Sequence, residues 1–103
     1  MGLPDLELIY HQLKNKYALV LTNAYALNAG FRVDCPVLFG QSCHNRFYLY
    51  LDGDLAVFDI ENLQGTAADH WHPCSTREAT QMIADFMEDT CEFDWCPVEF
   101  KEV

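Results

Sequence analysis

Apolar residues recur every three to four positions near the N-terminus and again after residue 75, and this spacing predicts two amphipathic helices. The first helix begins near Pro4, with acidic residues in its first turn. Its apolar stripe consists of Leu6, Ile9, Tyr10, Leu13 and Tyr17. The second helix begins after Ser75, which forms a capping box with Glu78 three residues later. Its stripe consists of Ala79, Met82, Ile83, Phe86 and Met87.

Between the two helices the pattern changes to alternation, which predicts β-strands. The strand-like runs are 31–34, 36–40, 46–61 and 67–72. Asp52-Gly53-Asp54 divides the third run into a tight hairpin. Because both faces of this hairpin carry aromatic or aliphatic residues, we expect it to lie centrally in the sheet, covered on both sides. Asp59 and Glu61 share one face of the returning strand, where we expect ordinary solvated acids. Residues 17–28 fit a helix and a buried strand equally well.

The order of these elements predicts that residues 1–103 form a single α+β domain. It consists of an N-terminal helix, an antiparallel meander of about four strands, a capped C-terminal helix packed on the sheet and a short C-terminal edge segment. The edge segment is CEFDWCPVEFKEV, residues 91–103, in which Pro97 restricts strand pairing. No run approaches the roughly 18 consecutive apolar residues that a membrane-spanning helix needs.

Acidic residues outnumber basic ones by 16 to 6, and the formal net charge is −10. The excess is concentrated near the C-terminus, because eight acids and one base, Lys101, follow from Glu78 onward and contribute −7. Such a surface repels nucleic acid and anionic membranes, and it attracts a basic partner. We therefore expect direct binding to neither nucleic acid nor membrane.

This charge distribution, together with the lack of a recognisable catalytic motif, favours a non-enzymatic binding protein that needs no cofactor. It would dock on a basic partner protein through the acidic C-terminal helix and tail. The candidate interface residues are Trp71, Glu88, Asp89, Glu92, Phe93, Asp94 and Trp95. The N-terminus lacks the basic region of a signal peptide, and the five cysteines include no C-x-x-C pair. We therefore expect a cytoplasmic protein with free thiols.

A second hypothesis concerns the stretch ADHWHPC, residues 68–74. On a strand, His70 and His72 point to one face and Trp71 to the other. The two imidazoles and Cys74 would form part of a tetrahedral zinc site with nitrogen and sulfur ligands. The remaining ligand would come from Asp69, Cys43 or His44. Such a site would make the chain a zinc-binding or small enzymatic domain.

The same stretch also fits a simple junction, in which Pro73 ends a strand and Ser75 begins a helix. We take the junction as the first interpretation and the zinc site as the alternative. Cys74 as a nucleophile, with His70 or His72 as its base, is a further alternative.

A third hypothesis is a self-associating structural domain, in which the edge segment and the aromatic tail form a homodimer. In size, acidity and layout, the chain is similar to small bacterial immunity proteins and to phage-encoded anti-defence inhibitors. The resemblance implies a binding or inhibitory role. Because no motif is shared, it assigns no site residue.

Overall fold

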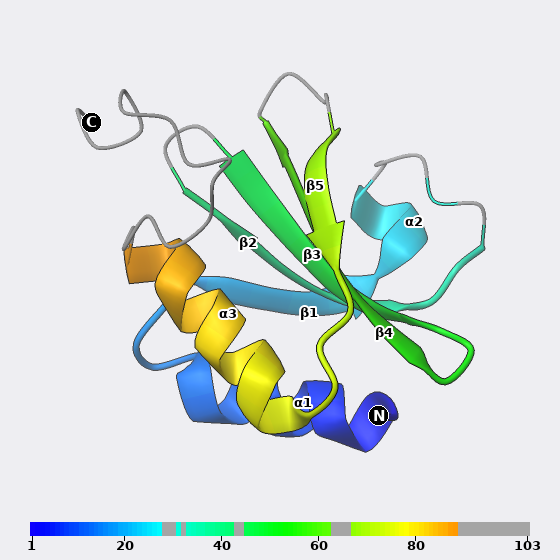
Figure 1. Ribbon diagram of the computed structural model, residues 1–103, viewed down its shortest axis with the longest axis horizontal. Coiled ribbons are helices and arrows are strands. Elements are labelled where there is room, and N and C mark those ends of the chain that lie inside the picture. The colour runs from blue at the N-terminus through cyan, green and yellow to red at the C-terminus, as the bar shows by residue number, and fades with distance from the viewer. Residues whose placement is uncertain (28–30, 32, 43–44, 63–66, 89–103) are drawn as a thin grey trace.

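The computed structural model describes residues 1–27, 31, 33–42, 45–62 and 67–88, with residues 67–69 described through their backbone alone. Within these residues, five strands form one antiparallel meander in the order β1-β2-β3-β4-β5 (Figure 1). The elements in chain order are α1 (Leu3–Leu13), β1 (Leu19–Asn23), α2 (Ala24–Leu27), β2 (Pro36–Gln41), β3 (Asn45–Asp52), β4 (Leu55–Asn62), β5 (Ala67–Trp71) and α3 (Thr76–Glu88). The predicted α+β arrangement is confirmed, with five strands rather than about four.

The first helix, α1, begins as its sequence predicts. The Gly2 N–H donates to Asp5 Oδ2 (2.7 Å), which satisfies one of the backbone donors that a helix start leaves unpaired. The predicted stripe continues to Tyr17, but α1 already ends at Leu13. The backbone N–H groups of Lys16 and Tyr17 both donate to Leu13 O, each at 2.9 Å. This turn redirects the chain into β1, so Tyr17 lies beyond the helix.

The capping of α3 is confirmed in part. Ser75 Oγ accepts the hydrogen bond of the Glu78 N–H (3.1 Å), as the capping box predicts. The returning bond goes to a neighbouring residue, since Glu78 Oε1 accepts from the Cys74 N–H (3.4 Å) instead of the Ser75 N–H. Both contacts stabilise the start of the helix. None of the helices in the described part of the chain is long and apolar enough to span a membrane.

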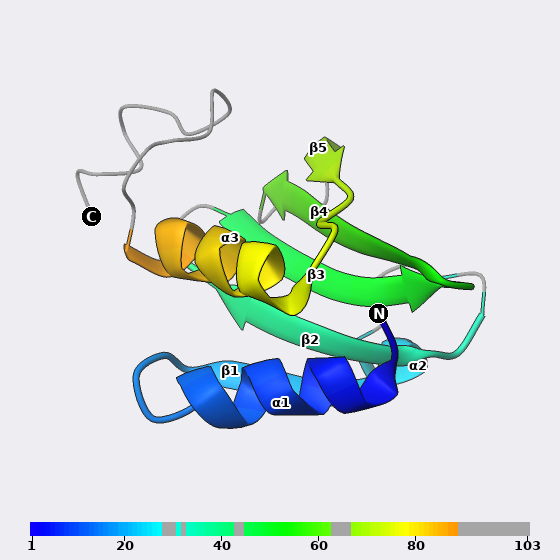
Figure 2. The ribbon, with the colours of Figure 1, turned by 60° about the horizontal axis from the view of Figure 1, so that its bottom comes forward.

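The main core lies between one face of the sheet and the two long helices, which Figure 2 shows side by side over that face. Its buried residues come from both helices and from four strands: Leu6, Ile9, Leu13, Leu19, Leu38, Phe47, Leu49, Phe58, Ile60, Ala79, Ile83 and Phe86. Phe47 is central, because its ring stacks on Phe58 (5.2 Å between centroids) and meets Phe86 edge-to-face (5.3 Å). This aromatic contact joins β3, β4 and α3.

The structure decides one open alternative in the segment before β2 and corrects one prediction there. Residues 17–28 contain both a strand and a helix, β1 and α2, where we left the two open. The described residues of 31–34 are not a strand. Their polar groups hold the α2 segment instead: Asp34 Oδ1 accepts from the Tyr25 N–H (3.1 Å), and the neighbouring Cys35 carbonyl accepts from the Ala24 N–H (2.8 Å). The predicted C-terminal edge segment, 91–103, lies outside the described residues.

The hairpin of β3 and β4 is central in the sheet, as predicted, and Gly53 adopts the positive φ (65°) that its turn requires. We call the face that points away from α1 and α3 the outer face; its described side chains are Val20, Thr22, Val37, Phe39, Gln41, Arg46, Tyr48, Tyr50, Asp52, Leu55, Val57, Asp59, Glu61 and His70. A smaller core covers one end of it, around the buried residues Ala24, Val37 and Tyr48. Within the residues that the structure describes, the hairpin is therefore covered by helices on one face, and on the other face toward α2.

Candidate functional site

The stretch around β5 has the alternation that the sequence predicts. Trp71 lies opposite Phe58, and its half-buried ring packs against the main core with the two ring centroids 6.3 Å apart. His70 points to the outer face, and its ring lies 5.4 Å from that of His72 in an edge-to-face arrangement. Both histidines are exposed. This packing gives Trp71 a structural role, and its role as a binding anchor stays a prediction.

The two histidines are the part of the predicted zinc site that the structure brings together. His72 Nδ1 lies 3.1 Å from the Ala56 carbonyl oxygen. Because a carbonyl only accepts, Nδ1 carries the proton, which leaves Nε2 as the nitrogen for a ligand.

The remaining predicted ligands do not complete this site. Cys74 is exposed, and its Sγ donates to the His72 carbonyl at 4.0 Å. Within the described part of the chain, no three side chains of the histidine, cysteine, aspartate or glutamate type are placed to hold a metal ion. Cys43, His44 and the side chain of Asp69 lie outside the described residues. The zinc site therefore stays a prediction.

A more ordered polar arrangement lies beside His70 on the outer face. The Tyr50 hydroxyl donates to Asp59 Oδ2, and the Tyr48 hydroxyl donates to Glu61 Oε1, both at 2.8 Å. Tyr48 is the direct cross-strand neighbour of Asp59. Each tyrosine therefore reaches diagonally, to the acid two residues beyond its own cross-strand neighbour. The two bonds have the same diagonal offset, and each holds one carboxylate in place.

Both tyrosines are protonated at pH 7, and burial keeps them protonated to higher pH. It raises the pKa of Tyr50, and the hydrogen bond to Asp59 adds to the rise. Burial likewise raises the pKa of the Tyr48 hydroxyl. Both groups are therefore neutral donors at pH 7. Arg46 Nε lies 3.8 Å from Glu61 Oε1, so this acid also has a cationic neighbour.

Aromatic contacts fix the two tyrosine rings. Phe31 meets Tyr48 and Tyr50 edge-to-face, with centroids 5.6 Å and 5.0 Å apart, and Phe39 stacks on Tyr48 at 5.4 Å. The row continues to Val20 on β1, which is 47% exposed. One row of cross-strand neighbours on the outer face thus runs across all five described strands and changes from apolar on β1 to polar on β5. Its members are Val20, Phe39, Tyr48, Asp59 and His70.

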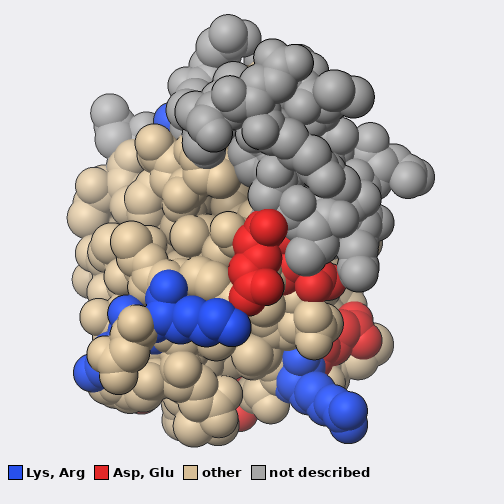
Figure 3. Space-filling view, turned by 90° about the vertical axis from the view of Figure 1, so that its left-hand side faces the viewer, with Lys and Arg blue, Asp and Glu red and all other residues tan. Residues whose placement is uncertain are grey.

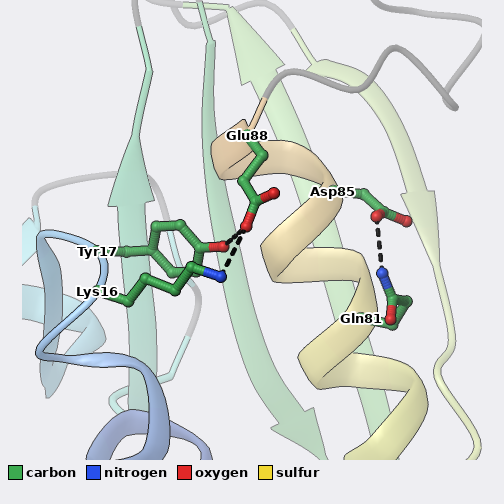
Figure 4. A network of polar contacts seen from close by, with 5 residues as sticks. All are labelled: Lys16, Tyr17, Gln81, Asp85 and Glu88. Atoms are coloured by element: carbon green, nitrogen blue, oxygen red, sulfur yellow. Dashed lines mark hydrogen bonds and ion pairs between the residues drawn. The ribbon is translucent and has the colours of Figure 1, made fainter.

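The acids of α3 form a second polar region. Figure 4 shows Glu88 facing Lys16 and Tyr17: its Oε2 lies 3.1 Å from Lys16 Nζ and accepts a hydrogen bond from the Tyr17 hydroxyl. The bond from Tyr17, followed by the contacts with Lys16, lowers the pKa of Glu88. On the same helix, Gln81 Nε2 donates to Asp85 Oδ1 (2.8 Å).

Glu88 thus ties the end of α3 to the segment that follows α1. Figure 3 shows one side of the molecule, where acidic and basic side chains of described residues lie close to one another. The other predicted interface residues of this region lie outside the described residues: Asp89, Glu92, Phe93, Asp94 and Trp95.

The tyrosine–carboxylate bonds were missed by the sequence reasoning, which treated Asp59 and Glu61 as ordinary solvated acids. A usable signal was present in the hairpin turn. Asp52 pairs with Leu55 across a two-residue loop, and this register places Tyr48 opposite Asp59. The diagonal reach of each hydroxyl depends on the twist of the sheet, which residue alternation does not contain.

Comparison with protein-family models, with curated proteins and with solved structures finds no significant match to this chain. Its function is therefore inferred from the chemistry of the outer face and of the acidic C-terminal part.

Proposed function

We propose that this chain is a small acidic cytoplasmic binding protein that docks on a basic partner protein. The main observation in support of this proposal is the uneven charge, with eight acids and one base from Glu78 to the C-terminus. A field of one sign accelerates encounter with an oppositely charged partner and disfavours partners of the same sign. A reducing compartment is consistent with the described cysteines, Cys35 and Cys74, which are free thiols.

The described acids of α3 support this role because their contacts hold the carboxylates in fixed positions. Glu78 caps the helix, Asp85 accepts from Gln81, and Glu88 is tied to Lys16. Lys16 offsets part of the charge of Glu88, so the larger share of the attraction falls to the acids that follow α3 in sequence. Asp89, Glu92 and Asp94 supply that charge.

The test is affinity capture from a cell lysate at low and at high ionic strength. The bait is the full chain, and the matched control is the variant D89N/E92Q/D94N. We expect the wild-type chain to retain a basic protein at low salt and to release it at high salt, because the Debye length falls from about 30 Å at 0.01 M to about 3 Å at 1 M. The variant should retain less of the same protein. Capture that is unaffected by salt and by the substitutions contradicts the proposal.

The zinc-binding alternative has one geometric observation in its favour, the 5.4 Å separation of the His70 and His72 rings. Elemental analysis of the untagged protein, purified without chelator, tests it beside the variant H70A/H72A. About one zinc per chain, lost in the variant, would favour the zinc-binding domain. Equal metal content in both samples counts against it.

A further inference from the structure

We propose that the outer face of the sheet is the surface that receives the partner, and that it binds an arginine-bearing segment beside Asp59 and Glu61. This inference rests on the proposed function and deepens it, because it names a surface and the chemistry of the group that the surface accepts. In this arrangement the acids near α3 and beyond it steer the partner, and the outer face makes the specific contact.

The charge of the outer face fits a cation. Among its described side chains, the carboxylates are Asp52, Asp59 and Glu61, and the basic side chains are Arg46 and His70. A partner that brings a guanidinium group therefore meets an excess of negative charge. Anionic partners such as nucleic acid are disfavoured by the same excess.

The geometry of the carboxylates favours arginine over lysine. Asp59 and Glu61 are two residues apart on β4, so both side chains point to the same face. The tyrosine hydroxyls bind one oxygen of each, Oδ2 of Asp59 and Oε1 of Glu61, and a carboxylate has further acceptor positions. A planar guanidinium bonds to carboxylates with two parallel N–H groups, whereas an ammonium group acts as a point charge.

The neighbouring aromatic and apolar groups provide the rest of the contact. Tyr50, Phe31 and Phe39 are joined into one group of rings through the buried Tyr48, and each of the three is itself partly accessible to solvent. A guanidinium stacks on such rings, and the exposed Val20 extends the surface toward β1. Aromatic residues next to a polar rim are typical of protein-binding surfaces.

The surface is also pre-ordered. It lies on the two central strands of the hairpin, and the bonds from Tyr48 and Tyr50 already hold the acids in one position. Binding therefore costs little side-chain entropy, which raises affinity for a given contact area.

The test uses the isotopically labelled full chain and a probe peptide of alternating arginine and alanine. A peptide of alternating lysine and alanine serves as the comparison. Amide chemical shifts are followed by NMR at low ionic strength. We expect the arginine peptide to shift the amides of β3, β4 and β5, and to bind more tightly than the lysine peptide.

Single substitutions test whether the peptide binds the outer face specifically or responds only to the overall negative charge of the chain. D59N and E61Q each remove one charge but keep an amide oxygen that accepts from the tyrosine, so both should fold, as dispersed amide spectra would verify. The matched control is E7Q on the exposed side of α1, which removes the same charge elsewhere. We expect D59N and E61Q to weaken arginine-peptide binding about tenfold, the scale of one charged hydrogen bond, and E7Q to leave it nearly unchanged.

Three outcomes overturn the inference, each in a different way. Shifts confined to α3 and to residues after it, with D59N indistinguishable from E7Q, reject the outer face and leave the proposed function standing. Equal affinity for the two peptides rejects the preference for arginine. If neither peptide binds and lysate capture also fails, the proposed function is rejected as well.

Discussion

Gly40 shows how closely the main core is packed around a single residue. It lies on β2 opposite Phe47, and a Cβ placed there would meet Phe47 Cε2 at 2.3 Å and Leu19 Cδ2 at 3.1 Å. Phe47 has no free space to move into, because it is fully buried against Phe58 and Phe86. Glycine is needed at this position for space.

We therefore expect G40A to lower the free energy of unfolding by about 3 kcal/mol, the upper part of the usual range for overpacking. The control is G53A, where a Cβ meets nothing within 4 Å and the strain of a positive φ costs about 1 kcal/mol. Urea denaturation measures both. Adding F47L should reduce the effect of G40A, because the smaller side chain removes the clash. An effect of G40A no larger than that of G53A contradicts this account.

Tyr50 predicts a dependence of stability on alkaline pH. Burial and the neighbouring Asp59 raise its pKa above the usual value of about 10. The folded state therefore holds the phenolic proton more tightly than the unfolded chain does. The stabilisation is fully present below pH 10 and is lost as the pH rises toward the folded pKa.

The variant Y50F isolates this contribution. It removes the hydroxyl, and with it about 1 kcal/mol of stability at neutral pH. Urea denaturation between pH 8 and pH 11 should show the wild type losing its advantage over Y50F as the pH rises, where cysteine and lysine titration affects both proteins alike. A difference that stays constant across the series would speak against a raised pKa.

The contact of Glu88 with Lys16 and Tyr17 joins α3 to the turn that follows α1. Since these hydrogen bonds lower the pKa of Glu88 from its usual 4.5, their stabilisation is present above pH 4.5 and is lost as the pH falls through the folded value. We expect E88Q to reduce hydrogen-exchange protection in the last turn of α3 at pH 7 and to flatten the acid dependence of stability. E7Q, an exposed acid on α1, is the control. Unchanged protection in E88Q would show that packing alone fixes the end of α3.

An element can be predicted from the sequence when the residues that determine it lie close together along the chain. The capped start of α3 and the hairpin turn at Gly53 depend on neighbouring residues, and both were predicted. The strand β1 was not separable from a helix, because its five residues alternate poorly and gain their identity from pairing with β2. The run 31–34 alternates without pairing as a strand in its described residues, and Asp34 bonds to the α2 segment instead.

The same distinction between local and long-range determinants applies to the candidate sites. The alternation of His70, Trp71 and His72 follows from strand geometry and was predicted. The contact between Tyr17 and Glu88 joins residues 71 positions apart, so only the packing of α1 and α3 produces it. Local patterns do not contain such contacts, and the role of Glu88 in the molecule was consequently missed.

The two faces of the sheet differ in chemical composition. The face under α1 and α3 carries the main apolar core, and the outer face combines carboxylates with aromatic rings. The chain has a net charge of −10, and this charge acts on both stability and association. Like charges repel within the folded chain, whereas a basic partner is attracted from a distance.

Salt should therefore change stability and binding in opposite directions. Screening of the −10 charge reduces self-repulsion, so the free energy of unfolding at pH 7 should rise as sodium chloride is increased from low ionic strength. Binding to the arginine peptide should weaken over the same series. Thermal unfolding and peptide titration in identical buffers measure the two trends, and sodium chloride avoids the general stabilising effect of sulfate. A fall in stability with salt would mean that attractive pairs such as Lys16 and Glu88 outweigh the repulsion, and the net charge would then not be the dominant electrostatic term in folding.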